Sequence, residues 1–583
     1  MEKRVFITMV LSVAIIIGWN MRPRWLFPEL RPPVQPSTAV VTPSAPVAPT
    51  VPASAGAPGE RPEEQRITVV RPGFFRAVFT SWGAAPAEFT LLNPQYKEKV
   101  WVPKKGAGAV RQGEDDPNWE SKLEPINLIK PQAGILPYSA YFPESSFQLP
   151  PSAAWTLTQQ TEDELVYTVD VGSVHLEKHW RLPREGYELG LQLVVEHRGK
   201  PGEAPITANL AVPVSGWQDP AERASGLGFG RRYKLTQASC DIGGKLRHKT
   251  HEDLLHGRSG GFLSCNQGVA QPPGFSESGD VKWVGIGEPF FLVAAAFGPT
   301  EGSERRCRLS GDPSGQVLAE ALFPTRRVEA GQKVTYEMAA YLGPKLLDRL
   351  DAVTVGGADV HLKDAVDYTL EFIARPMLWV LKQIQRVVWN WGVAVILITI
   401  LLKLITYYPT VRSMKSMRAM TSLKPKMDAL REKYGEDKNR LNQEVMNLYK
   451  QHGINPLGGC LPMLIQMPIY LAFYSMLSNA VEIYRASFVG PVNDLTAPYW
   501  PLAVITGGIM FIQAKLSPQS PDSQQQQMMM YMMPVMMALF TLFTPSGLTL
   551  YILINSLLTM AQQWWFNRTH PLTPSPASKP ARA

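Results

Sequence analysis

The sequence has little cysteine and lacks the short motifs that mark nucleotide hydrolysis or nucleophilic catalysis. Only four of its 583 residues are cysteines. No G-x-x-x-x-G-K-[ST] loop and no Ser/His/Asp elbow occurs in its apolar stretches. An excess of one charge is also lacking over residues 63–350, which hold 32 Lys and Arg against 34 Asp and Glu. These absences argue against an ATPase and against a nucleic-acid-binding domain.

Cysteine and histidine spacing gives no framework for a metal site. Three cysteines lie within residues 63–350 and one beyond them: Cys240, Cys265, Cys307 and Cys460. Three is odd, so at most one disulfide forms there, and a Cys240–Cys265 bridge and free thiols both stay open. The nearby histidines fit no zinc-ligand spacing: His248, His251 and His256. We expect no bound metal and no cofactor.

The N-terminus resembles a secretory signal that is not removed. Lys3 and Arg4 precede an apolar run, and no small-x-small cleavage site follows it. We therefore predict a signal-anchor transmembrane helix over residues 1–25, with its start in the cytoplasm. Residues 26–62 are rich in Pro, Ala, Ser and Thr and predict a stiff linker.

Short runs that alternate apolar and polar residues fill residues 63–350. Gly and Pro separate them, a pattern typical of β-strands. The runs include ITVV, FFRAVFT, LVYTVDV, YELGLQLVVEH, ITANLAVPV and FFLVAAAF. We predict a large all-β sandwich domain. Such domains can carry glycosidase sites, but no carboxylate pair can be brought together from sequence alone, so we favour a scaffold or interaction role.

Residues 358–389 change to helical spacing. Apolar residues recur every three or four positions from Leu362 to Val388, and charged residues occupy the other face. With Trp379 and Trp389 present, we predict an amphipathic helix that lies along the outer membrane interface.

Residues 390–566 predict an all-α core of five membrane spans. The run NWGVAVILITILLKLITYYP (390–409) is long enough to cross a membrane and holds one cation, Lys403. The expected spans are about 391–408, 457–480, 499–516, 528–543 and 548–566. Residues 411–459 carry ten cations against five anions, which indicates a cytoplasmic segment. The β domain would then be exported, and both termini, including the tail 567–583, would be cytoplasmic.

The basic segment itself predicts a cytoplasmic helical hairpin over 410–455. Two apolar stripes face one another across Gly435–Asp437, and Asp437 would cap the second arm. The hairpin residues singled out are Met427, Leu430, Tyr434, Leu441 and Val445.

Polar residues within the spans gather in their cytoplasmic halves. Thr399 and Lys403 are four residues apart and share a helix face. We predict a hydrophilic groove lined by Lys403, Thr399, Gln466, Gln513, Asn555 and Tyr551. The alternative is that Lys403 only extends past Tyr407 to the interface.

Methionine is concentrated in the same region, since 17 of 22 residues lie after Pro409. Flexible thioethers can repack around many apolar partners, although they also suit a plain lipid-facing surface. The apolar slide predicted here comprises Met463, Met467, Met529, Met533 and Met536. The 16-residue span 528–543 is short and would thin the bilayer locally.

Three segments carry a clear resemblance to the YidC membrane protein insertase family. They are the 390–409 run, LKPKMDALREKYGEDKNRLNQEVMNLYKQHGINPLGGCLPMLIQMPIYLAFYSML and FTPSGLTLYILINSLLTMAQQW. WVGIGEPFFLVAAAF, YLGPKLLDRLD and DYTLEFIARPMLWVLK resemble the Gram-negative form with a large periplasmic domain. The resemblance implies a periplasmic super-β-sandwich and a groove open to cytosol and lipid. The family commonly has arginine where this sequence has Lys403, which keeps the charge but not the bidentate fork.

The resulting hypothesis is an insertase of the bacterial inner membrane, not an enzyme, that works without ATP. Expected partners are the lipid bilayer, the Sec translocon and nascent one- or two-span proteins with acidic flanks; the ribosome and the signal-recognition receptor stay open. Two other classes were weighed. A small-anion transporter or channel would need a polar path to the outer face and internal repeats, and we see neither. A periplasmic carbohydrate-binding enzyme on a membrane tether would need an active β domain.

Overall fold

The structure is a computed structural model that describes residues 63–99, 101–104, 107–111, 123–130, 132, 134–219, 235–257, 273–299, 304–435, 437–453, 461–516 and 531–569. Side chains are not described at 98, 99, 101–111, 424, 438, 461–464 and 533. The predicted signal anchor and linker (1–62) and most of the tail therefore lie outside the described residues, as does Cys265.

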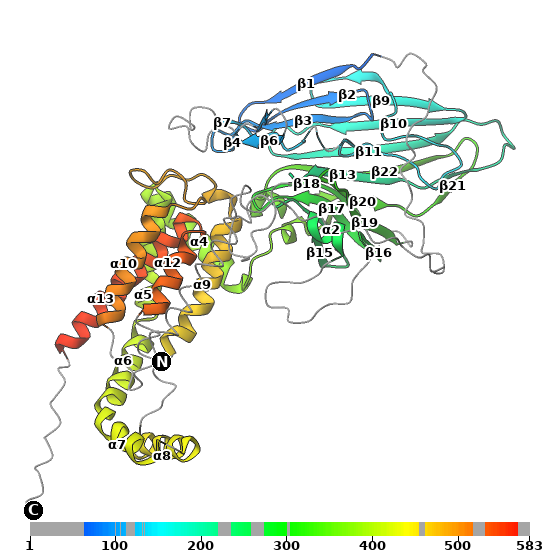
Figure 1. Ribbon diagram of the computed structural model, residues 1–583. Coiled ribbons are helices and arrows are strands. Elements are labelled where there is room, and N and C mark those ends of the chain that lie inside the picture. The colour runs from blue at the N-terminus through cyan, green and yellow to red at the C-terminus, as the bar shows by residue number, and fades with distance from the viewer. Residues whose placement is uncertain are drawn as a thin grey trace, which may run out of the picture. The chain divides into compact units, whose positions relative to one another are not determined.

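A nine-stranded antiparallel sheet forms the centre of the β domain (Figure 1). In spatial order its strands are β15 (Lys245–Thr250), β14 (Gln237–Ile242), β17 (Val281–Gly287), β18 (Phe291–Phe297), β22 (Lys333–Pro344), β11 (Glu188–His197), β10 (Val174–Arg181), β9 (Glu164–Val171) and β8 (Thr156–Gln160). Strand β11 alternates half-buried and buried residues along its length, whereas β18 is buried throughout. The prediction of an extensive β-structure is confirmed.

Two smaller sheets cover the inner face of this sheet. One is β13 (Ala211–Trp217), β20 (Gln316–Leu322), β19 (Arg305–Gly311) and β16 (Phe275–Gly279), and the other is β1 (Arg66–Arg71), β2 (Phe75–Thr80) and β3 (Ala85–Leu91). The four-stranded sheet packs on β14, β17 and β18. The three-stranded sheet meets β10 where the rings of Phe79 and Trp180 lie 5.3 Å apart.

Short elements complete the β domain. Strand pairs are β4 (Lys97–Lys99) with β7 (Leu123–Pro125), β5 (Trp101–Lys104) with β6 (Ala107–Arg111), β12 (Ile206–Ala208) with β21 (Arg326–Val328), and β23 (Thr354–Val355) with β24 (Ala358–Asp359). Helical turns are α2 (His251–His256), α3 (Leu347–Leu350) and η4 (Leu362–Ala365).

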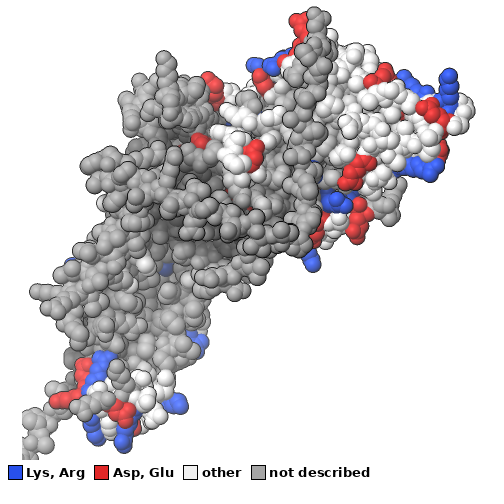
Figure 2. Space-filling view, turned by 45° about the vertical axis from the view of Figure 1, so that its right-hand side comes forward, with Lys and Arg blue, Asp and Glu red and all other residues white. Residues whose placement is uncertain are grey.

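On the described surface that Figure 2 shows, positive and negative side chains are interspersed.

The disulfide of the β domain joins Cys240 to Cys307. A Cys240–Cys265 bridge, left open by the sequence, is therefore wrong. Cys240 lies on β14 of the nine-stranded sheet and Cys307 on β19 of the four-stranded sheet, with their Cα atoms 6.6 Å apart. The bridge follows from the stacking of two sheets, which brings together residues 67 apart in sequence.

Lys178 is sealed inside the β domain. Its side chain is fully buried, and its ammonium donates hydrogen bonds to the carbonyls of Gly83 (2.9 Å) and Tyr138 (2.6 Å). Both acceptors sit in left-handed turns, with φ of +72° and +64°. Burial lowers the pKa of Lys178 to about 7.

The amphipathic helix is α4 (Glu371–Val388), and it begins later than the spacing predicted. The prediction was wrong for residues 358–370, because His361 and Leu370 take positive φ values of 54° and 56° that interrupt a helix. The apolar residues Leu362 and Val366 are instead buried in the hydrophobic core outside any α-helix. Phe372, Trp379 and Val387 of α4 are exposed, as is Trp389 directly after it.

The C-terminal region is a bundle of helices (Figure 1). Its members are α5 (Trp391–Ile405), α9 (Leu461–Asn479), α10 (Trp500–Leu516), α12 (Met533–Thr541) and α13 (Ser546–Thr569), with the turn η6 (Val481–Ile483) after α9. Helix α13 packs against α5, α9, α10 and α12, so it is the element that the others share. Each predicted span thus contains a helix.

A bend separates α5 from α6 (Tyr407–Ser422). Taken together, these two helices have the length and apolar composition of a span but are bent by 59°. By the same measure, none of the other helices in the described ranges reaches the length and hydropathy of a span alone, and α10 is a shorter apolar helix. Pro409 explains the bend, because it lacks the N–H that would bond to Ile405 and its ring clashes with that carbonyl.

Candidate functional site

One face of α13 carries a polar stripe. Tyr551, Asn555, Thr559 and Gln562 follow one another at intervals of four, four and three residues, so they project from the same side of the helix. The Thr559 hydroxyl donates to the carbonyl of Asn555 at 2.6 Å. We call these four residues the α13 stripe.

Lys403 meets the α13 stripe from α5. Its ammonium donates to the Thr559 hydroxyl at 2.7 Å, and its side chain is half-buried. Among the residues that the structure describes, no carboxylate lies within ion-pair distance of it. A half-buried cation without an acidic partner is costly in an apolar setting and is available to a carboxylate that approaches it.

Thr399 lies one turn before Lys403, but its side chain is 1% exposed. Its hydroxyl donates to the carbonyl of Val395 at 2.6 Å, four residues back in the same helix. Such a bond satisfies the hydroxyl within α5. Thr399 is therefore close to the stripe without presenting a free polar group to it.

The upper part of the stripe contacts α9. The amide of Gln466 donates to the hydroxyl of Tyr551, and the Tyr551 ring stacks on Phe473 with centroids 4.5 Å apart. Gln513 is half-buried on α10, which packs on α13. Lys403 of α5 and Gln466 of α9 therefore both bond to side chains of α13, the helix that carries Tyr551 and Asn555.

Gln562 is the last residue of the α13 stripe. Both polar atoms of its amide are buried, and within the described ranges neither has a hydrogen-bond partner. A buried amide without a partner is costly, and water or a polar group of a bound chain would satisfy it.

Two of the predicted apolar-slide methionines are exposed. Met467 on α9 is 54% exposed and Met536 on α12 is 55% exposed. Met529 lies outside the described residues, as do the side chains of Met463 and Met533.

Within the predicted hairpin, 410–455, helices α7 (Lys424–Tyr434) and α8 (Lys438–Gln451) pack on one another, whereas residues 410–422 belong to α6. Asp437 caps α8 by accepting from the backbone N–H groups of Asn439 and Arg440, which confirms the predicted cap. A small buried cluster joins the arms and consists of Leu423, Met427 and Tyr449, with Val445 packed against it. Leu430, Tyr434 and Leu441 are half-buried.

Thr559 and Tyr449 were missed by sequence reasoning. Thr559 follows Asn555 by four residues, and Tyr449 follows Val445 by four, so helical spacing could have found both. Of the histidines weighed for zinc, His251 instead contacts the carbonyl of Asp312 at 2.7 Å. The three do not gather into a metal-ligating group in the described part of the chain.

These features define the class of protein: a β domain followed by a helical bundle that has an exposed apolar surface and the polar α13 stripe. The sequence matches two families, described as YidC periplasmic domain over residues 120–380 and as 60Kd inner membrane protein over residues 383–573.

Two relatives are both named Membrane protein insertase YidC. The one from Syntrophus aciditrophicus is 30% identical over 97% of this chain and 100% of its own. The one from Anaeromyxobacter sp. (strain Fw109-5) is 31% identical over 88% of this chain and 86% of its own. A solved structure of an active YidC insertase, with its first transmembrane domain resolved, matches over 86% of this chain and 92% of its own. The sequence identity is 18% and the TM-score is 0.33. The chain belongs to the YidC family.

Proposed function

We propose that this protein inserts nascent membrane proteins into the bacterial inner membrane and assists their folding, alone or with the Sec translocon. The observation that carries the proposal is the contact of Lys403 with the α13 stripe. Membership of the YidC family supports it, because the relatives are named membrane protein insertases.

The proposed site is a hydrophilic groove between α5 and α13 that opens to the cytoplasm and to lipid. Moving an unsatisfied polar group through hydrocarbon costs several kcal/mol. A groove lined by a lysine and by polar side chains, among them the buried amide of Gln562, would lower that cost over part of the path. Lys403 would attract acidic flanks of the incoming chain, while Gln466, Gln513, Asn555 and Gln562 would keep the groove wet and Thr399 would support its wall.

The apolar part of the incoming chain would move along the exposed methionines. Met467 and Met536 are exposed in a region whose neighbouring large apolar side chains are exposed as well, and a lipid-facing slide is the role that such a surface suits. No covalent step and no ATP are needed, because the insertion of an apolar helix into lipid is itself favourable.

The topology belongs to the same proposal. We place the β domain in the periplasm, α4 along the outer interface, five spans in the membrane and the α7–α8 hairpin in the cytoplasm. Exposed Trp379 and Trp389 on and after α4 suit a headgroup environment. The hairpin would receive the nascent chain first.

Complementation tests the function. A bacterial host depleted of its own insertase would receive this chain, and insertion of a small single-span protein with an acidic flank would be followed by protease protection. We expect the wild-type chain and Lys403→Arg to restore insertion, and Lys403→Glu to reduce it by about tenfold or more. Lys515→Glu is the matched control, because Lys515 is an exposed lysine at the end of α10. Full insertion by Lys403→Glu would contradict the role given to the Lys403 charge. Absence of insertion by the wild-type chain would contradict the proposed function.

A further inference from the structure

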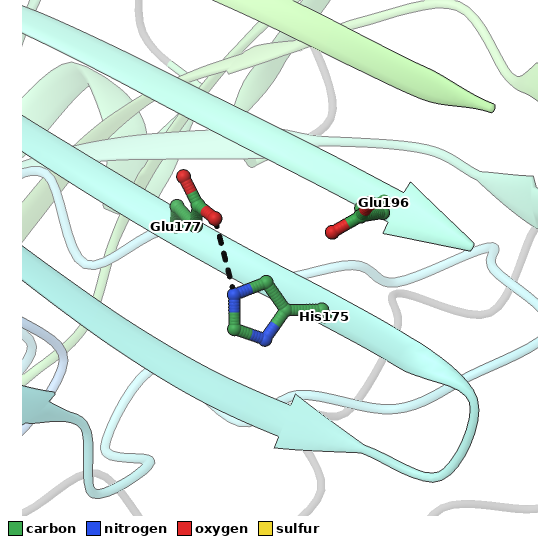
Figure 3. Close-up of side chains that lie close together, drawn as sticks. All are labelled: His175, Glu177 and Glu196. Atoms are coloured by element: carbon green, nitrogen blue, oxygen red, sulfur yellow. Dashed lines mark hydrogen bonds and ion pairs between the residues drawn. The ribbon is translucent and has the colours of Figure 1, made fainter. Parts of the chain in front are cut away.

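A row of charged side chains crosses the outer face of the nine-stranded sheet. His175 on β10 is paired directly with Asp170 on β9 and with Glu196 on β11. Glu177, two residues further along β10, points to the same face. Figure 3 shows His175 and Glu177 on one strand and Glu196 on the next. Ligand atoms of His175, Glu177 and Glu196 all lie within 4.8 Å of one another.

The imidazole of His175 stands between two carboxylates. Its Nδ1 is 2.6 Å from Asp170 Oδ1, and its Nε2 is 3.2 Å from Glu177 Oε1. An ionised carboxylate only accepts hydrogen bonds, and a neutral imidazole has a single N–H. If Nδ1–H serves the closer Asp170, the lone pair of Nε2 faces an oxygen of Glu177. In that tautomer Nε2 can coordinate a cation that Glu177 also binds.

His179 repeats the arrangement on the other side of Glu177. Its Nδ1 is 3.2 Å from Glu164 Oε1, and its Nε2 is 3.3 Å from Glu177 Oε2. Each imidazole thus has one carboxylate outside it and Glu177 inside. A carboxylate on the far nitrogen is the usual partner of a metal-bound histidine, because it fixes the tautomer and the ring orientation.

The charges around the row leave room for a divalent cation. Four carboxylates lie in it: Glu164, Asp170, Glu177 and Glu196. Three cations oppose them: Arg198 and Lys333 contact Glu196 at 2.7 and 3.3 Å, and Arg181 is paired with Glu164 across β10 and β9. Carboxylates still outnumber basic side chains in the row, and this excess favours a bound cation.

We propose that His175, Glu177 and Glu196 bind one divalent transition-metal cation of the zinc type, with water as a fourth ligand. Imidazole and carboxylate are ligands that zinc accepts at about 2.0 to 2.2 Å. Small side-chain rotations would bring the three atoms onto one ion. Asp170 holds the imidazole through Nδ1 and is a positioning residue. The bound ion would fasten β10 to β11, independently of any insertase activity.

Metal titration of the full-length chain tests the proposal. Untagged protein in detergent, stripped with chelator, is titrated with ZnCl2 by calorimetry and with CoCl2 by visible absorption. We expect one ion per chain for the wild type. His175→Gln and Glu177→Gln should weaken binding by more than roughly 100-fold, and Asp170→Asn by about 10-fold.

His179→Gln is the matched control, because His179 shares Glu177 but is not among the three ligands. We expect it to change affinity by less than about fivefold, and the exposed His361→Gln to have no effect. The absence of one-to-one binding by the wild type would overturn the proposal. Equal loss of binding in His175→Gln and His179→Gln would overturn the ligand assignment. Circular dichroism of each variant checks that its β-structure is intact.

Discussion

The β domain and the helical bundle differ most in where their large apolar side chains point. In the described part of the β domain, Val70 is the one large hydrophobic side chain that is exposed. From Phe372 onwards such side chains are exposed on α4, α5, α9, α10, α12 and α13. A soluble surface rarely shows so much apolar area in one region. In the proposed topology the two regions would face different solvents, water for the first and lipid for the second.

Their lysines differ in the same way. Lys178 of the β domain is sealed and bound to two carbonyls, whereas Lys403 of the bundle is half-buried and donates to one threonine hydroxyl. A lysine with all its contacts inside the fold acts on stability. A half-buried lysine beside the polar α13 stripe can bind a ligand.

The largest expected effect concerns the disulfide, which only the β domain has among the described residues. Removing it as Cys240→Ala with Cys307→Ala frees a loop of 67 residues and should lower the free energy of unfolding of this domain by roughly 4 kcal/mol. Guanidinium unfolding of the full chain in detergent, followed by the circular dichroism of β-structure, measures it. Cys265→Ala is the control and should change little; a loss as large as that of the double variant would point to a different bridge.

The next effect compares one substitution in both regions. Ile505→Lys places a charge on the exposed apolar side of α10 and should cost about 2.5 to 3.5 kcal/mol of membrane insertion. Val70→Lys places the same charge on an exposed strand position and should stay within about 0.5 kcal/mol. Carbonate extraction of the expressed chains reports the first and chemical unfolding the second. If Ile505→Lys extracts no more readily than wild type, α10 does not face lipid there.

The third effect is a pH dependence confined to the β domain. Lys178 has a pKa of about 7 when folded and near 10.4 when unfolded, so the unfolded state binds more protons between these values. Stability should therefore rise by about 1.4 kcal/mol per pH unit from pH 7 towards pH 10 through this group. Unfolding of wild type and Lys178→Met across pH 7 to 9.5 isolates the contribution. Parallel curves for the two proteins would contradict it.

The smallest effect concerns the start of α5. Asn390 caps this helix by accepting from the backbone N–H of Val393 at 3.0 Å, and its amide donates to the carbonyl of Phe488 at 3.0 Å. Asn390→Ala should cost about 1 kcal/mol. Asn390→Asp keeps the cap but replaces the donor to Phe488 with an acceptor, so its loss reports the Phe488 contact with the cap intact. Thermal unfolding followed by helical circular dichroism provides the values, and identical losses in both variants would show that the cap adds nothing.

Local patterns predicted the secondary structure well, and long-range pairings could not be read from them. The alternating runs became strands, and Asp437 capped its helix. Helical spacing misled at Leu362 and Val366, because side chains of a short turn can be buried at the same intervals without a continuous helix. The partner of Cys240 depends on how two sheets stack, and no local pattern carries that information.

The candidate site shows the same limit. Lys403 was conspicuous because a cation in an apolar run is rare. Thr559 was not, since a threonine in a helix is ordinary until a partner from another helix reaches it. Helical spacing placed Thr399 beside Lys403, but only the packing of α5 shows that Thr399 is buried.

The most direct test of the central claim is photo-crosslinking to a ribosome-stalled single-span nascent chain during insertion. The probe would replace Lys403 or Gln562 of the proposed groove, or Ala394, which is fully buried in α5, as a control. The account predicts crosslinks from positions 403 and 562 and none from position 394. Insertion of the nascent chain without a crosslink from position 403 or position 562 would contradict the proposed groove.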